Sequence, residues 1–189
     1  MDPVIGLVAA YRVAGSLVVL RWPFWGGVVA VACDLGDLLL FDIARTYGGW
    51  PGFDGYQAFD KWLDQVYLGA FLIVAIQDFP TVARRIAVAL WLFRFVGFLA
   101  FEAGVLSRDA LILVPNVFEF WFLALAFTLR YRPSFRWTIG RSAAILIVLL
   151  AGKLVQEWAL HVGRLFDELT FLGGLRSIIE FISGPITGR

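Results

Sequence analysis

The chain has 189 residues, of which 60% are hydrophobic and 16% aromatic, whereas a typical soluble domain is about 45–50% apolar. Lys and Arg number 16 against 15 Asp and Glu, so the net charge is +1, and this balance gives no case for nucleic-acid binding, which needs a basic surface. The single cysteine excludes an intramolecular disulfide. The composition predicts an integral membrane protein whose first partner is the lipid bilayer.

Six stretches of roughly 20 mostly apolar residues are long enough to cross a bilayer as helices. The first carries Arg12 near its middle, and the fifth contains Pro115, which should kink that helix. The predicted spans are Pro3–Leu20, Phe24–Ile43, Gln57–Ile76, Val82–Phe101, Ala110–Thr128 and Thr138–His161. The sequence therefore predicts an all-α, polytopic integral membrane bundle of about six helices, forming a single domain over residues 1–189.

The C-terminal tail, residues 165–182, has a different pattern. Its large aliphatic residues recur at helical spacing on one face: Leu165, Leu169, Leu172, Leu175, Ile179 and Ile182. Such a face predicts an amphipathic helix lying in the membrane interface. Gly173 and Gly174 leave open two shorter pieces.

Arginine and lysine in the short loops predict the orientation. One face carries six of them, namely Arg21, Arg84, Arg85, Arg130, Arg132 and Arg136. The other face carries three, namely Arg45, Lys61 and Arg108. The N-terminus is therefore expected outside, together with the loop between the second and third spans.

Polar residues in the predicted spans fall in one half of the membrane, because odd and even spans run in opposite directions. They are Asp34, Asp37, Asp42, Asp60, Asp64, Arg94, Glu102, Asn116, Glu119, Lys153, Glu157 and His161. Charge within hydrocarbon is costly and seldom faces lipid. These residues are therefore expected to turn inward and to line a polar pocket, with an ion-pair network around it.

Carboxylates outnumber the available cations in this set, so some should be protonated, solvated or bound to a cation. A carboxylate cluster suits hard ions such as Mg²⁺, Mn²⁺ or Ca²⁺. A plainer interpretation stays open, in which Arg94 and Lys153 pair with glutamates and only hold helices together. Asp34, Asp37 and Asp42 could also be solvated at the interface, and Asp60 could cap a helix.

The arrangement Asp34-x-x-Asp37, followed after a loop by Asp60-x-x-x-Asp64, resembles part of the CDP-alcohol phosphotransferase signature. That family is a six-span membrane fold that binds a divalent metal through four aspartates. The resemblance implies that Asp34, Asp37, Asp60 and Asp64 ligate Mg²⁺ or Mn²⁺, with Asp64 as the candidate catalytic base. The chain departs from the pattern where the family has glycine and this sequence has Leu38, and the Ala-Arg pair follows three residues late.

Three classes of function remain open. The pocket could serve a cation or a polar lipid headgroup in ion- or proton-coupled transport. It could belong to a metal-dependent, phosphotransferase-like enzyme that modifies lipids, so whether the chain is an enzyme stays open. It could also belong to a structural or accessory subunit. Because a carrier of this length is small, a homo-oligomer or partner membrane subunits are expected.

Overall fold

The computed structural model describes residues 2–52, 55–106 and 113–161, and over these ranges the chain is helical with connecting loops and no β-strand. The helices in this part are α1 (Pro3–Leu17), η1 (Val18–Leu20, a 3₁₀ turn), α2 (Pro23–Gly48), α3 (Tyr56–Asp78), α4 (Thr81–Glu102), α5 (Val117–Tyr131) and α6 (Ile139–His161). The predicted all-α class is confirmed. The interfacial helix predicted at 165–182 lies outside the described residues.

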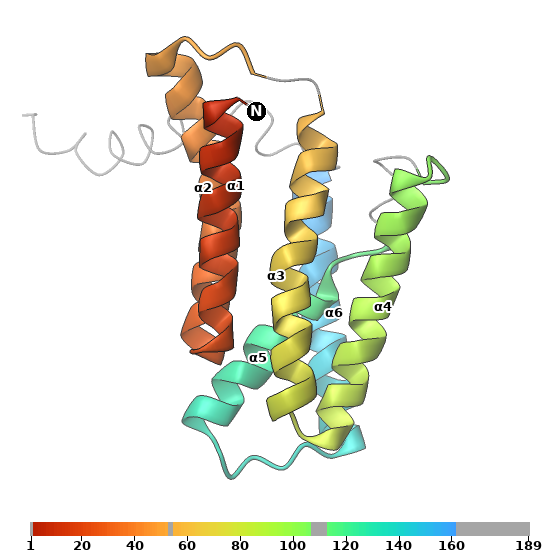
Figure 1. The fold of residues 1–189 in the computed structure, drawn as a ribbon. Coiled ribbons are helices and arrows are strands. Elements are labelled where there is room, and N and C mark those ends of the chain that lie inside the picture. The colour runs from red at the N-terminus through yellow and green to blue at the C-terminus, as the bar shows by residue number, and fades with distance from the viewer. Residues whose placement is uncertain (1, 53–54, 107–112, 162–189) are drawn as a thin grey trace, which may run out of the picture.

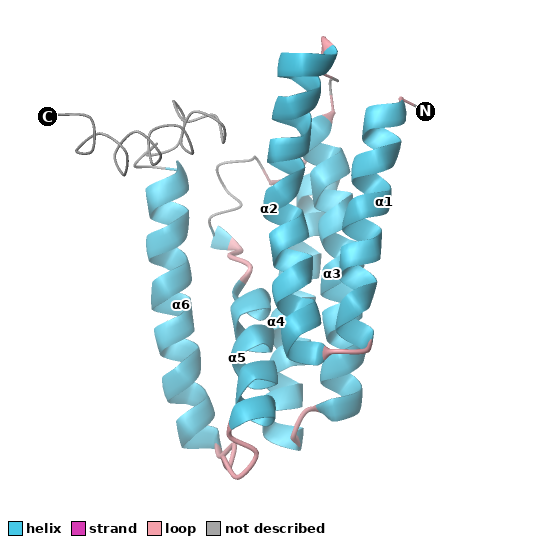
Figure 2. Ribbon diagram, turned by 90° about the vertical axis from the view of Figure 1, so that its left-hand side faces the viewer, coloured by secondary structure: helices cyan, strands magenta, loops and turns pink. Residues whose placement is uncertain are grey.

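The helices run roughly side by side as a bundle, in which α1 packs against α2 and α3 (Figure 1). The connections after α1, α3 and α5 lie together at one end of the bundle, as Figure 2 shows from the side. The alternation of direction that the span pattern predicts is therefore present in the fold.

Two helical stretches in the described ranges are long and apolar enough to cross a membrane. They are Pro3–Leu20 and Ile139–Gln156, with mean hydropathies of 1.8 and 1.6. Charged residues inside the other helices, such as Asp37 in α2 and Arg94 in α4, weaken the same signal there. The six-span arrangement stays a prediction that these two stretches support in part.

Proline and glycine set the ends of α2. Pro23 occupies the first turn of this helix, where its missing N–H costs no hydrogen bond. Gly49 ends the helix with a φ of 61°, in the left-handed region that favours glycine. Near its start, α2 passes so close to η1 that a Cβ on Gly26 would lie 2.4 Å from Val19 Cα.

Aromatic side chains fill the core between α3 and α5. Phe71 and Phe122 stack with ring centroids 4.0 Å apart, and both are fully buried. Trp121 is also fully buried, and its indole Nε1 donates to the carbonyl oxygen of Ala83 on α4 at 3.1 Å. This core holds α3, α4 and α5 together and fixes the position of α5 along the bundle.

The expectation of a kinked fifth helix from Ala110 is wrong, because α5 begins only at Val117 and residues 113–116 are not α-helical. Pro115 disfavours an earlier start, since proline supplies no N–H and biases the residue before it away from helical backbone. The non-helical backbone packs on α4 at Gly97, where a Cβ would lie 2.4 Å from Val114 Cγ1. As a result, α5 starts part-way along the bundle (Figure 2).

Candidate functional site: an aspartate–arginine cluster

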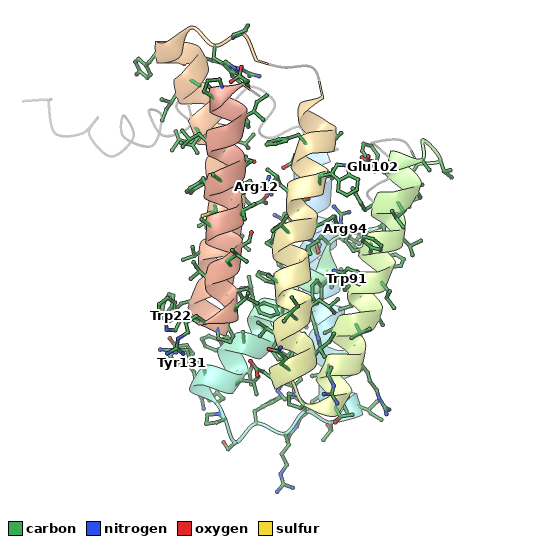
Figure 3. All side chains as sticks on the ribbon, viewed as in Figure 1. Arg12, Trp22, Trp91, Arg94, Glu102 and Tyr131 are labelled. Atoms are coloured by element: carbon green, nitrogen blue, oxygen red, sulfur yellow. The ribbon has the colours of Figure 1, made fainter. Side chains whose placement is uncertain are left out.

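Four aspartates surround one arginine where α1, α2 and α3 meet. Arg12 on α1 is 2% exposed. Its Nη1 donates to Asp37 Oδ2 and to Asp60 Oδ1, each at 2.8 Å. Its Nη2 donates to Asp64 Oδ1 at 2.8 Å and to Asp34 Oδ1. Figure 3 shows Arg12 lying between α1 and α3. We call these five residues the aspartate–arginine cluster.

Helical spacing and a close helix contact assemble this cluster. Asp37 follows Asp34 by three positions on α2, and Asp64 follows Asp60 by four positions on α3. Each pair therefore shares a helix face. On α1, a Cβ at Gly15 would lie 2.4 Å from Cys33 Sγ on α2. This close approach keeps α1 against α2, which holds the Arg12 guanidinium within reach of both pairs.

The cluster is buried on one side and accessible on the other. The side chain of Asp37 is 1% exposed, whereas those of Asp34 and Asp60 are 26% and 21% exposed. Lys61 lies on the accessible side, with its Nζ 2.8 Å from Asp60 Oδ2 and 3.6 Å from Asp64 Oδ2. The cluster is therefore accessible beside Asp34 and Asp60.

Carboxylates are in excess in this cluster, as the sequence predicts for the wider set. Among the described residues, the three carboxylates of Asp34, Asp60 and Asp64 share two cationic partners, Arg12 and Lys61. An uncompensated buried carboxylate is costly and is neutralised by a proton or a bound cation. The site therefore has the charge to accept at least one positive charge.

Three of these carboxylates could hold a metal ion. One oxygen from each of Asp34, Asp37 and Asp60 can be chosen so that all three lie within 4.8 Å of one another. Carboxylate oxygens suit hard divalent ions such as Mg²⁺ and Mn²⁺, so the donor chemistry fits. The guanidinium of Arg12 contacts all three, so a metal ion would share these ligands with Arg12 or displace it.

A second polar network lies at the start of α5. The hydroxyl of Tyr67 donates to Glu119 Oε2 at 2.9 Å. Asn116 Nδ2 lies 3.1 Å from both Tyr67 Oη and Glu119 Oε2. All three side chains are buried, and Asn116 Oδ1 has no partner within the described part of the chain. Glu119 lies in the first turn of α5, where the helix dipole favours a negative charge.

Two of the remaining predicted residues form contacts at the α4 face. Arg94 Nη1 donates to the carbonyl oxygen of Val114 at 2.9 Å and so supports the backbone before α5. Glu102 is exposed and accepts from Trp62 Nε1 at 3.1 Å. Figure 3 shows Arg94 and Glu102 on α4, with Glu102 nearer to its end. Neither residue belongs to the aspartate–arginine cluster.

The other predicted residues lie on α2 and α6. Asp42 is half-buried on α2, beyond Asp37. Lys153 is buried on α6, where its Nζ lies 3.1 Å from Gln156 Oε1 and 5.2 Å from the centre of the Phe120 ring. The side chains of Glu157 and His161 lie outside the described part of the structure. The interpretation of Asp60 as a helix cap is wrong, because α3 begins at Tyr56 with Gly55 as its N-cap.

Arg12 is the site residue that the sequence analysis missed. The sequence places it in the middle of the first apolar stretch, whereas the cationic partners expected for the carboxylates were Arg45, Lys61, Arg94, Lys153 and His161. Arg45 is exposed and stacks 5.9 Å from the Trp50 ring centre instead. The sequence does contain a signal for it: a single guanidinium inside an apolar helix is costly unless it pairs with carboxylates.

No family model, no curated protein and no solved structure matches this chain. The function is therefore inferred from the geometry of the aspartate–arginine cluster.

Proposed function

We propose that this chain is a multi-pass membrane protein that binds a cation at the aspartate–arginine cluster. The main observation is that three aspartates, Asp34, Asp60 and Asp64, share two cationic partners among the described residues, Arg12 and Lys61, so that carboxylate is in excess. The donor set fits a divalent metal ion best, because all of its atoms are hard oxygens. Two helical stretches that can cross a membrane and the apolar composition support the membrane setting.

Arg12 has a defined part in this proposal. In the structure it compensates part of the negative charge of the cluster, and an incoming cation would compete with its guanidinium for Asp34, Asp37 and Asp60. Binding would then loosen the contact that joins α1 to α2 and α3. An internal cation that alternates with a bound ion is a simple means of coupling ion binding to helix movement, so we place the activity in ion- or proton-coupled transport.

The transport claim is tested in proteoliposomes that contain a fluorescent indicator for pH or Mn²⁺. Wild-type protein is expected to move the ion, and Asp64→Asn is expected to abolish the flux because it removes a buried Arg12 partner. Asp78→Asn, an exposed carboxylate remote from the cluster, is the matched control and should retain the wild-type rate. Equal flux in the wild type, Asp64→Asn and empty liposomes would contradict transport.

A structural or accessory role is the second candidate, favoured by one observation. Arg12 links α1 to both α2 and α3 through buried ion pairs, so the cluster can serve to fix three helices. Under this role, variants of the cluster lower stability, and cations leave stability unchanged. The phosphotransferase-like alternative uses the same aspartates, and its metal ion would likewise have to compete with the Arg12 guanidinium.

A further inference from the structure

The end of the bundle where α1, α3 and α5 connect to the next helices is strongly basic. Exposed arginines surround it: Arg21, Arg85, Arg130, Arg132, Arg136 and Arg141. Arg84 lies half-buried beside them. Asp78 is the carboxylate that the described residues place at this end. The surface therefore carries a large positive excess, opposite in sign to the aspartate–arginine cluster.

None of these arginines pairs with a carboxylate among the side chains that the structure describes. Their contacts are with neutral groups instead. Arg84 Nη1 donates to the carbonyl oxygen of Ile76 at 3.2 Å, and Arg141 Nη1 to that of Arg136 at 3.3 Å. The guanidinium groups of this surface thus retain most of their capacity to bind anions.

Aromatic and aliphatic side chains lie beside the arginines. Arg21 lies 5.9 Å from the Trp22 ring centre, and Arg130 lies 5.5 Å from that of Tyr131. Figure 3 shows Trp22 and Tyr131 at this end. Large apolar side chains are exposed next to them: Leu17, Leu20, Trp25, Phe127 and Ile139. We call these apolar side chains the apolar belt; aromatic rings beside exposed arginines are typical of a membrane–water interface.

We infer that this arginine-rich end binds anionic phospholipid, with the phosphates on the guanidinium groups and the acyl chains along the apolar belt. The inference rests on the membrane setting of the proposed function, but not on cation binding. An acidic protein or free phosphate would use the arginines and leave the apolar belt uncovered. Lipid satisfies both parts of the surface, and clusters of four to eight basic residues beside membrane helices are typical of anionic-lipid recognition.

The experiment measures the melting temperature of purified protein in neutral detergent during titration with dioctanoyl phosphatidylglycerol. Dioctanoyl phosphatidylcholine and sodium phosphate are titrated in parallel. Phosphatidylglycerol alone is expected to raise the melting temperature, since a ligand of the folded state stabilises it by mass action. The triple variant Arg132→Gln, Arg136→Gln, Arg141→Gln is expected to bind more weakly. The phosphatidylglycerol concentration at the midpoint of the titration should rise about 100-fold, because each arginine at the membrane surface contributes roughly fivefold in affinity.

Two matched variants complete the test. Arg45→Gln, an exposed arginine at the opposite end of the bundle, should keep the wild-type midpoint. Arg132→Lys, Arg136→Lys, Arg141→Lys keeps the charge and should keep most of the binding, which separates lost recognition from lost folding. Equal stabilisation by both lipids, or a wild-type midpoint in the glutamine triple variant, would overturn the inference. If phosphate alone reproduced the shift, an anion site without lipid specificity would replace it.

A flotation assay separates this inference from the proposal on which it rests. Wild-type protein should float with phosphatidylcholine liposomes after reconstitution and should resist extraction by carbonate. Failure to float would remove the membrane setting and the lipid inference together. Flotation without any preference for anionic lipid would remove the lipid inference alone.

Discussion

Arg12 is the residue on which the site depends most. Its guanidinium is 2% exposed and supplies hydrogen bonds to four carboxylates on two other helices. Removing one partner of a buried charge pair commonly costs about 3–5 kcal/mol, because the remaining charges stay buried without compensation. The four aspartates would repel one another in the absence of the arginine.

We therefore predict that Arg12→Gln lowers the free energy of unfolding by about 3–5 kcal/mol. Arg12→Lys should recover only part of the loss, because an ammonium group cannot reproduce the planar set of donors. Urea denaturation of both variants in detergent checks the prediction, with the exposed Arg21→Gln as control. Wild-type stability in Arg12→Gln would show that the ion pairs contribute little.

Asp2 is an ionisable residue outside the helical spans. It caps α1 by accepting from Val4 N at 2.8 Å, and it accepts from Trp50 Nε1 at 2.8 Å. These hydrogen bonds, chiefly that from Trp50, hold the pKa of Asp2 below its ordinary value of 3.8. A carboxyl group with a lowered folded-state pKa stabilises the fold above its unfolded-state pKa, and this stability is lost as the pH falls through the folded-state value.

The resulting prediction concerns acid stability. Between about pH 6 and pH 3, the melting temperature of Asp2→Asn should fall less than that of the wild type, because the variant has no carboxylate to protonate. At neutral pH the variant should be the less stable of the two. Melting curves recorded along the pH series test this, with Trp50→Phe as a second variant that removes the main hydrogen bond. Superimposable pH profiles for wild type and Asp2→Asn would refute it.

Among the elements, α2 depends on glycine to approach η1. A Cβ at Gly26 would meet backbone atoms of Val18 and Val19 at 2.4–2.5 Å, and backbone cannot move aside as a flexible side chain can. Gly69 on α3 gives the matched contrast, because a Cβ there meets nothing within 4 Å. The two glycines therefore test helix packing against helix propensity.

Gly26→Ala is predicted to destabilise the protein by about 1–3 kcal/mol, the usual cost of forcing extra atoms into a packed contact. Gly69→Ala is predicted to stabilise it by about 0.5–1 kcal/mol, because alanine is the better helix former. Denaturation of both variants under one set of conditions measures the difference. The same sign for both substitutions would contradict the close contact between η1 and α2.

The start of α5 depends on its buried hydrogen bonds. Glu119 Oε2 accepts from the hydroxyl of Tyr67 and from Asn116, and a hydrogen bond to a charged group contributes about 1.5–3 kcal/mol. Tyr67→Phe should therefore lower the free energy of unfolding by about that amount. Thr128→Val, which removes a half-buried hydroxyl bonded within α5, is the control. An unchanged stability in Tyr67→Phe would mean that the network is not held as the structure has it.

At the scale of the whole molecule, the sequence predicts the class of fold better than the details of the site. Apolar runs, Pro23 and Pro80 place the ends of several helices, since local chemistry sets those ends. The convergence of Asp34, Asp37, Asp60 and Asp64 follows from helical spacing and antiparallel direction. The choice of Arg12 as the shared partner depends on tertiary packing at Gly15, which no local pattern contains.

Cation binding at the aspartate–arginine cluster can be tested by measuring the melting temperature with and without Mn²⁺ or Mg²⁺. A ligand at 100 times its dissociation constant stabilises the folded state by about 2.7 kcal/mol, so a clear rise is expected for the wild type. Asp60→Asn should show no rise, whereas Asp78→Asn should match the wild type. A wild-type melting temperature that no divalent ion raises, or an equal rise in Asp60→Asn, would refute cation binding at the aspartate–arginine cluster.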